Sequence, residues 1–193
     1  MISPVTLEGR LVRLEPLSRE HIAPLWAVAD DPEIWRLTGS RIGSPEEARA
    51  YVETALRWQE EGTGLPFVVV YRPTRELAGS TRYGNIVPEH KRLEIGWTWL
   101  ARKWHRTGVN RESKLLLLAY AFEVLGYNRV EIKTDVLNEN SRRAIEALGA
   151  RQEGILRRHM ITPAGRVRDT VYYSLIAEEW PEAKKRLEAA VRG

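Results

Sequence analysis

One short stretch combines basic side chains, a glycine and the expected start of a helix. It lies between an aromatic strand and a long apolar helical run, and it reads His105, Arg106, Thr107, Gly108, Val109, Asn110 and Arg111. Backbone N–H groups at a helix N-terminus lack partners within the helix, and the helix dipole places partial positive charge there. The basic side chains could add charge-assisted bonds, and Gly108 would allow a close backbone approach. The stretch therefore fits a cradle for a pyrophosphate. It also fits an ordinary strand-to-helix turn, which is favoured on this stretch alone.

The residue types that are missing exclude several kinds of catalysis. The chain has no cysteine, which rules out a thiol nucleophile, a disulfide framework and a Cys-rich metal site. Its histidines show no paired metal-ligand spacing, so no metal site is expected. Neither G-x-S-x-G nor G-x-x-x-x-G-K-[ST] occurs in the sequence. Serine hydrolases of the elbow type and P-loop NTPases are therefore disfavoured.

Length, composition and charge narrow the class of protein further. The chain has 193 residues, 43% of them hydrophobic, and no linker or repeat, so one domain over residues 1–193 is expected. No apolar run approaches the roughly 18 residues of a bilayer span, and no secretory signal is visible, so a cytoplasmic location without a membrane partner is expected. The net charge of +4 suits an anionic ligand. The basic residues are scattered, which argues against nucleic acid as the main partner.

The elements that must position this stretch follow from periodicity and turn signals. Alternation predicts strands near residues 10–16, 65–71, 77–86, 93–100, 130–136, 155–161 and 167–175. Helical spacing predicts helices after Ser18 and Ser44, and at residues 111–125, 142–148 and 181–191. The long helix at 111–125 allows the strands on either side of it to be parallel neighbours. The predicted class is α+β with a mixed sheet.

Several ordered motifs follow this helix. They are Asn138-Glu139-Asn140-Ser141, Leu148-Gly149-Ala150, Glu153-Gly154, Leu156-Arg157, Asp169, Tyr173-Ser174 and Glu179-Trp180. Together with the order strand, loop, long helix, strand, they resemble the GNAT acyltransferases, and more narrowly the RimJ/RimL type, which acetylates protein N-termini. The match runs from about Leu7 to the C-terminus. The family loop is Q/R-x-x-G-x-G/A, and this chain departs from it at His105 and Asn110.

The resemblance implies a particular sheet and a donor bound within it. The implied fold is a GNAT-like mixed, mainly antiparallel seven-stranded sheet with a splayed central parallel pair, flanked by helices. The first strand of that pair carries a bulge, for which Gly96 is the expected kink residue. The pantetheine arm of acetyl-CoA lies in the gap like an extra strand. The implied cofactor-binding residues are Trp99, Leu100, His105, Arg106, Thr107, Gly108, Val109, Asn110, Arg111, Asn138 and Ser141.

Acetyl transfer to an amine needs a base, a stabilised oxyanion and a proton for the departing thiolate. Glu94 is the candidate base because it lies on the splayed strand, and its alternative role is that of a salt-bridged strand carboxylate. Ser141 is, by transfer from the family, the candidate proton donor to the sulfur. Its alternative role is the N-cap of the helix at 142–148, and one hydroxyl could fill both roles. Asp169 and Glu153 are weaker alternatives as bases.

Seven tryptophans could line an acceptor pocket or fill the core. Trp97 and Trp99 share one face of their strand, and strict alternation would point Glu94 to the other face unless a bulge intervenes. Trp35 lies in the N-terminal helical region that covers the acceptor groove in relatives. Trp35 and Trp97 are therefore the candidate substrate-binding residues, and most of the other tryptophans are expected in the core.

The predicted function is acetyl-CoA-dependent N-acetyl transfer to a primary amine, either a protein or peptide N-terminus or a small amine. Attack is expected to be direct, in a ternary complex, because the chain has no thiol and shows no catalytic triad. A coenzyme A-binding module without turnover is the alternative, given the altered loop. A basic nucleic-acid-binding protein is a more distant one. The sequence leaves open whether the chain forms a homodimer.

Overall fold

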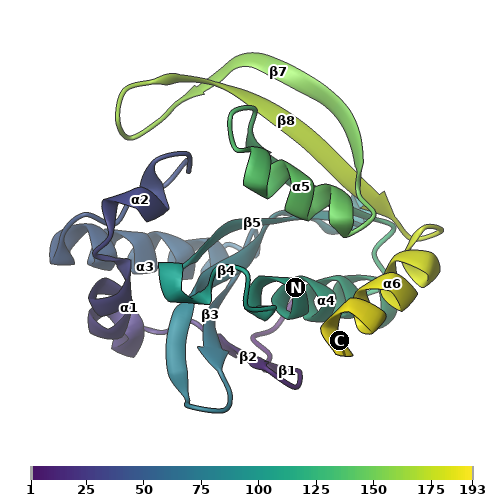
Figure 1. Cartoon of the computed structure of the whole chain (residues 1–193), viewed down its shortest axis with the longest axis horizontal. Coiled ribbons are helices and arrows are strands. Elements are labelled where there is room, and N and C mark those ends of the chain that lie inside the picture. Colours follow the sequence, from purple (N-terminus) through teal and green to yellow (C-terminus); the bar gives the residue numbers. More distant parts are fainter. Residues whose placement is uncertain (1, 193) are drawn as a thin grey trace.

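The computed structural model describes residues 2–192 and contains one open sheet of eight strands (Figure 1). The strands are β1 (Leu7–Glu8), β2 (Val12–Pro16), β3 (Leu65–Tyr71), β4 (Glu76–Val87), β5 (Arg92–Leu100), β6 (Arg129–Asp135), β7 (Arg151–Ile161) and β8 (Val167–Ile176). The α-helices are α1 (Ile22–Ala29), α2 (Pro32–Trp35), α3 (Pro45–Glu60), α4 (Val109–Ala119), α5 (Glu139–Ala147) and α6 (Trp180–Arg192). No helix within residues 2–192 is both long and apolar enough to cross a bilayer.

The sheet confirms the predicted α+β class and the predicted crossover. Its order is β1-β2-β3-β4-β5-β6-β8-β7, and β5 and β6 are its parallel pair, joined by α4. The expected strand count of seven is wrong by one. The additional strand is β1, whose two residues pair with β2. Two residues are too few to show the alternation by which strands are recognised in a sequence.

The helices begin where the local sequence satisfies their free N–H groups. The Ser44 hydroxyl accepts from the Glu47 N–H at 3.1 Å, and Pro45 follows as the first helical residue of α3. The Glu47 carboxylate accepts from the Gly43 N–H, one residue before the position that a capping box predicts. α2 was not predicted, because its four residues are too short to show periodicity.

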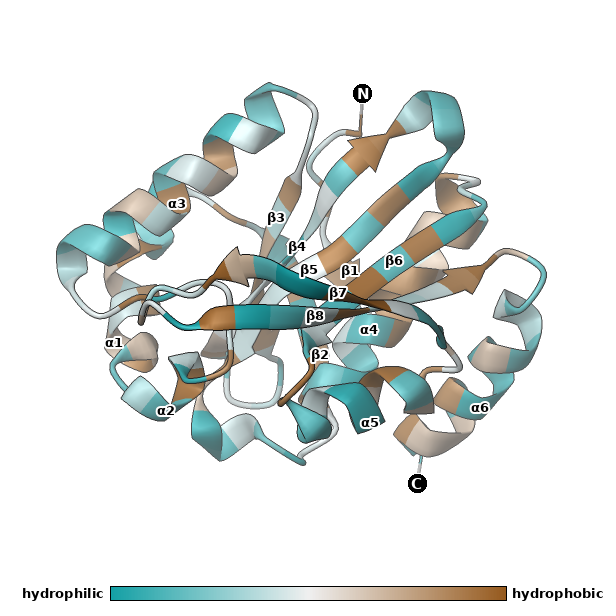
Figure 2. Cartoon of the chain, turned by 90° about the horizontal axis from the view of Figure 1, so that it is seen from above, coloured by the Kyte–Doolittle hydropathy of each residue, from teal (hydrophilic) through white to brown (hydrophobic). Residues whose placement is uncertain are grey.

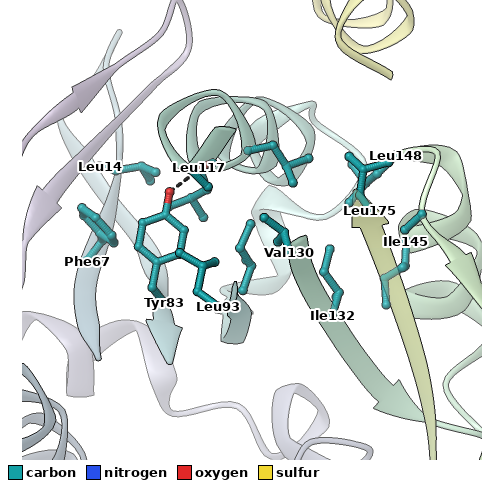
Figure 3. Close-up of a cluster of buried hydrophobic side chains, with 14 of the residues drawn as sticks. Leu14, Phe67, Tyr83, Leu93, Leu117, Val130, Ile132, Ile145, Leu148 and Leu175 are labelled. Atoms are coloured by element: carbon teal, nitrogen blue, oxygen red, sulfur yellow. Dashed lines mark hydrogen bonds between the residues drawn. The ribbon is translucent and has the colours of Figure 1, made fainter. Parts of the chain in front are cut away.

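A large core cluster lies between the sheet and the pair α4 and α6 (Figure 3). Tyr83 on β4 is fully buried, and its hydroxyl donates to the Leu117 carbonyl of α4. Leu93 of β5 and Val130 of β6 lie in the same cluster. Such burial contributes roughly 1.5–3 kcal/mol for each large apolar side chain. The apolar packing thus fixes α4 under the parallel pair.

The opposite face of the sheet is covered by α1, α2 and α3, which form a second cluster. Leu25 of α1, Ala48 and Val52 of α3, and Trp99 of β5 belong to it. Beyond these helices, β7 and β8 form a long hairpin that passes over the strands (Figures 1 and 2). In both views the turn of the hairpin lies toward α2. The second face is therefore bounded by α3 and the α2 region on one side and by the hairpin on the other.

Candidate active site

The parallel strands β5 and β6 pair over only three residue positions. Arg92 pairs with Arg129, Leu93 with Val130, and Glu94 with Glu131. β5 continues to Leu100 and β6 continues to Asp135 without further pairing between them. The two strands therefore part directly after Glu94, as the splayed pair of the sequence analysis requires. Backbone groups on the facing edges beyond this point are available to a ligand.

A bulge in β5 lies just beyond the point of divergence. On β4 the pairing advances from Arg82 to Ser80, while on β5 it advances from Gly96 to Trp99, so β5 has one extra residue. Trp97 has a φ of 50°, in the left-handed region that side chains rarely adopt. The kink residue is therefore Trp97, and the expectation of Gly96 is wrong by one position. Gly96 instead leaves space for Glu94, because a Cβ there would lie 2.9 Å from Glu94 Oε1.

The bulge brings Glu94 and Trp97 to the same face of the sheet. The Lys133 ammonium lies 3.0 Å from Glu94 Oε2 and 5.7 Å from the centre of a Trp97 ring. Thr98 points the other way, where its hydroxyl accepts from Lys114 of α4 at 2.6 Å. If β5 alternated strictly through this point, Trp97 would lie on the α4 face.

Glu94 is held in a buried ion pair. Its side chain is 2% exposed, and its Oε2 accepts from Lys133 at 3.0 Å and from the Asn85 amide at 2.7 Å. Both of the roles considered for this residue meet here, because the carboxylate lies at the divergence and is also salt-bridged. Its function as a base stays a prediction.

The loop before α4 leaves a row of donors free. Arg106 and Gly108 have φ values of 62° and 88°, and Gly108 is the N-cap of α4. Within residues 2–192, the N–H groups from Arg106 through Arg111 donate no hydrogen bond. The buried Oδ1 of Asn110 also has no partner among the described residues. The free N–H groups can bind an anion, and Asn110 Oδ1 can accept a hydrogen bond from a donor on the same ligand.

The side chains of the loop divide into free and engaged groups. The Arg106 side chain is exposed and forms no hydrogen bond or ion pair within the described residues. The His105 ring lies 3.0 Å from the Leu100 carbonyl, and Thr107 Oγ1 donates to the Trp104 carbonyl at 2.7 Å. Arg111 donates to the Ala190 carbonyl of α6 at 3.0 Å. Arg106 is therefore the basic side chain of this loop that can turn to a ligand.

Asn138, and not Ser141, caps α5. The Asn138 side chain accepts from the Ser141 N–H at 3.0 Å, which makes Ser141 the third residue of the helix. The expectation that Ser141 is the N-cap is therefore wrong. Both residue types are good caps, and they lie three positions apart. The Ser141 hydroxyl forms no hydrogen bond within residues 2–192, and its side chain is half-buried.

The tryptophans named as candidate acceptor contacts have different surroundings. Trp35 is 9% exposed, its indole N–H donates to the Ala29 carbonyl, and its ring lies 5.0 Å from that of Trp99. Trp97 is half-buried and meets Trp58 edge to face at 5.1 Å. A Cβ at Gly84 would lie 2.2 Å from the Trp97 ring, so in this arrangement the ring fills the space that a side chain at residue 84 would need. Trp97 is the more accessible of the two candidates.

The weaker alternatives as bases are engaged with neighbouring groups. The Arg129 guanidinium, followed by the Ser174 hydroxyl, lowers the pKa of Glu153 to about 2. Both Glu153 oxygens accept from Arg129 at 2.6 Å. Asp169 accepts from the Arg158 N–H at 2.6 Å. Glu153 is therefore a carboxylate of very low basicity.

Sequence reasoning missed a group of buried charges near the divergence. The buried ones are Arg82, Lys114, Asp135 and Arg168, and the partly buried Lys133 and Arg166 lie with them. Asp135 pairs with Arg166, and burial lowers the pKa of Lys114 to about 7. They come from β4, α4, β6, β8 and the turn before β8, so no single motif along the chain connects them. The fold brings these distant segments together.

Comparison with known proteins decides the family. The family model for the acetyltransferase (GNAT) domain matches residues 11–151. The chain belongs to the GNAT acetyltransferases. Within this family it is 32% identical over 145 residues to a Bacillus subtilis (strain 168) protein named "Putative ribosomal N-acetyltransferase YdaF", covering 73% of this chain and 77% of that one. This relative confirms the resemblance to the RimJ/RimL type.

Solved GNAT structures share the fold. A GCN5-related N-acetyltransferase from Brucella melitensis has a TM-score of 0.89 and 31% identity, covering 98% of this chain and 86% of that chain. Mycobacterium smegmatis RimJ in complex with CoA-disulfide has a TM-score of 0.83 and 24% identity, covering 98% and 96%. The chain is therefore an acetyltransferase with the GNAT fold.

Proposed function

We propose that the chain transfers the acetyl group of acetyl-CoA to a primary amine by direct attack in a ternary complex. The observation that carries this proposal is the parting of β5 and β6 after Glu94, beside an α4 N-terminus with free N–H groups. Members of the family use acetyl-CoA, and the similar RimJ structure holds a CoA derivative. The divergent strand edges fit its pantetheine arm, and the free N–H groups fit its pyrophosphate.

The residues that would hold acetyl-CoA fall into two groups. Backbone groups of Trp99 and Leu100 on β5 would bind the pantetheine arm as a strand would. The N–H groups of residues 106–111, with the Arg106 guanidinium, would bind the pyrophosphate. His105, Val109 and Asn138 stay predicted contacts; Val109 is fully buried and would contribute its N–H alone. Bound in this way, acetyl-CoA supplies the acetyl thioester.

Glu94 is the base in this proposal. It would accept a proton from the incoming ammonium, directly or through water, so that the nitrogen lone pair can attack the acyl carbon. A backbone N–H of the divergent part of β5 would stabilise the oxyanion. An α-amino group, with an ordinary pKa of about 8, is partly neutral near pH 7, so a weak base suffices for it.

Ser141 donates the proton that the departing thiolate needs. Its hydroxyl has no partner among residues 2–192, while Asn138 caps the helix, so the hydroxyl is free for this role. The half-buried position lets water return the proton after each turnover. The ammonium loses two protons in all. One passes to Glu94 before attack, and Glu94 later releases it to solvent. The other leaves the nitrogen as the thiolate departs and passes through water to replace the proton that Ser141 gives to sulfur.

The relatives and the amine chemistry support a primary amine as the acceptor. The name of the YdaF relative points to ribosomal protein N-termini, and small primary amines present the same nucleophile. Trp97 would line the acceptor side of the gap, together with Trp35, whose ring packs against Trp99. The cytoplasmic location stays a prediction of the sequence, and the question of a homodimer stays open.

A coenzyme A-binding module without turnover is the second candidate. It is favoured by one observation, the engagement of the Glu94 carboxylate by Lys133 and Asn85. Release of free thiol from acetyl-CoA, measured with a panel of amines and N-terminal peptides, separates the two. Acceptor-dependent thiol release is expected. Tight binding of acetyl-CoA in calorimetry without any acceptor-dependent thiol would overturn the proposal in favour of the module.

A further inference from the structure

Two arginines are buried near the divergence without an anionic partner. Arg82 of β4 is 2% exposed and Arg168 of β8 is 5% exposed. Neither guanidinium forms a hydrogen bond or an ion pair within residues 2–192, and the Nε atom of each is completely buried without a partner. Buried guanidinium groups are normally paired, since desolvation of an unpaired charge is costly. The rest of the described chain therefore supplies no anionic partner for either guanidinium.

Both arginines belong to the network around Glu94. Arg82 stacks on the rings of Tyr51 and Trp97 at 4.6 and 5.5 Å, and Lys133 lies over the same Trp97 and pairs with Glu94. Burial lowers the pKa of Arg168, while the charges of Asp135 and Glu94 act in the opposite direction. The two guanidinium groups therefore lie on the acceptor side of β5, to either side of the candidate base.

The charges of this network do not cancel. Its cations are Arg82, Lys133, Arg166 and Arg168, and its anions are Glu94 and Asp135. Lys133 pairs with Glu94, and Arg166 pairs with Asp135, whose other oxygen accepts from the Leu137 N–H at 3.0 Å. Four positive and two negative charges leave two positive charges unbalanced. An acceptor that carries a second cationic group besides its amine would be repelled from such a site, whereas an acceptor with an anionic group would be attracted.

The Arg168 guanidinium lies beside the segment between α2 and α3 and beside β7. A Cβ at Gly39, in the segment between α2 and α3, would lie 3.3 Å from Arg168 Nη1 and 3.5 Å from the Met160 sulfur of β7. The turn of the β7–β8 hairpin lies toward α2 in Figures 1 and 2. Arg82, in contrast, lies behind aromatic rings and acts on a ligand through its charge.

We infer that the acceptor amine also carries a carboxylate, and that Arg168 binds this carboxylate while Arg82 adds to the attracting field. The inference rests on the proposed function, since it concerns the acceptor of that reaction. A planar carboxylate fits the paired donors of a guanidinium, which would then recover the partner that the chain lacks. A free amino acid offers this chemistry, and so does a peptide whose N-terminal residue is Asp or Glu.

Matched acceptors test the inference. Each acceptor with a carboxylate is compared with its amide: amino acids with amino acid amides, and peptides that begin with Asp or Glu with peptides that begin with Asn or Gln. The carboxylate member of the correct series is expected to have a kcat/KM about tenfold higher, because a hydrogen bond to a charged group exceeds a neutral one by about that factor. The series that shows the difference identifies the source of the carboxylate.

Variants then assign the effect to Arg168. Arg168→Gln is expected to remove at least about tenfold of the preference by raising KM for the carboxylate member, with little effect on its amide. Arg168→Lys, which keeps the charge, is expected to restore part of it. Arg186→Gln is the matched control, because it removes the same charge from an exposed position on α6 and should change neither acceptor. Melting temperature and acetyl-CoA affinity report whether each variant is folded.

The outcomes for the inference and for the proposed function are separable. Failure of acetyl-CoA to bind, or absence of thiol release with every amine, refutes the proposed function. In that case calorimetric binding of the same carboxylate and amide pairs still decides the inference. The inference would be overturned if the two members of each pair had equal kcat/KM or equal affinity, or if neither member bound. It would also be overturned if Arg168→Gln lost activity equally with both members.

Discussion

Replacing Lys114 with methionine should stabilise the protein, and the gain should depend on pH. Lys114 is 6% exposed, and its sole hydrogen-bond partner within residues 2–192 is Thr98 Oγ1 at 2.6 Å. Burial lowers the pKa of Lys114 from 10.5 to about 7. Because the unfolded chain holds this proton more tightly, burial of the charged lysine destabilises the fold.

The magnitude follows from the two pKa values. The difference between 10.5 and about 7 is about 3.5, and at about 1.36 kcal/mol for each pKa unit it corresponds to an upper figure of about 5 kcal/mol. Below pH 7 the lysine is protonated in both states, so the full penalty applies. Between pH 7 and 10.5 the unfolded state binds more protons than the folded state, so the free energy of unfolding rises with pH. Met has a similar length and no charge, so Lys114→Met should remove both the penalty and this rise.

Urea unfolding of the parent and of Lys114→Met, at several pH values from 6 to 10, measures the effect. The variant is expected to exceed the parent by roughly 2–5 kcal/mol at pH 6 to 7, and the difference should shrink steadily toward pH 10. Lys185→Met, at an exposed position on α6, controls for a general effect of lost charge. A difference that is the same at every pH, or a destabilised variant at pH 7, would refute the reasoning.

Four further substitutions test the site and its support. Arg106→Ala should weaken acetyl-CoA binding by about 1.5–3 kcal/mol in calorimetry, and an unchanged affinity would place the pyrophosphate elsewhere. Glu94→Gln should lower kcat about 100-fold or more and flatten its rise with pH, whereas a profile like that of the parent would show that Glu94 is not the base. Ser141→Ala should lower kcat by a similar factor at unchanged melting temperature, because Asn138 caps the helix; a normal kcat would exclude the proton-donor role. Glu112→Gln should cost about 2–3 kcal/mol of stability in urea unfolding, because the buried carboxylate accepts from the N–H groups of residues 10–12, and a change below about 0.5 kcal/mol would contradict that role.

The sequence predicted the architecture well because its signals are local and periodic. Alternation located seven strands, and the length of the helix between residues 93–100 and 130–136 predicted the parallel pair. Ser44 and Pro45 marked the start of α3 through residue types that satisfy helix N–H groups. The ordered motifs then identified the family, which the match over residues 11–151 confirms.

The parts that could not be predicted depend on contacts between distant residues. Asn138 and Ser141 are equally suitable caps by type, and only the structure shows that Asn138 fills the role. The bulge was expected at Gly96 because glycine adopts unusual backbone angles freely, but the packing of the Trp97 ring against Gly84 fixes it one residue later. Arg82 and Arg168 resemble the other arginines in the sequence, and their burial becomes visible only when β4 and β8 take their places in the sheet.

The extra residue at Trp97 gives β5 two successive phases along one strand. Residues up to Gly96 alternate in one phase, and residues from Trp97 onward alternate in the other. Deleting the extra residue would restore regular pairing between β4 and β5: the Trp97 indole would be lost from the acceptor face, while Trp99 would stay on that face and Thr98 would stay on the α4 face. One inserted residue thus adds a third side chain to the acceptor face between Gly96 and Trp99, while the pairing with β4 on either side of it keeps its register.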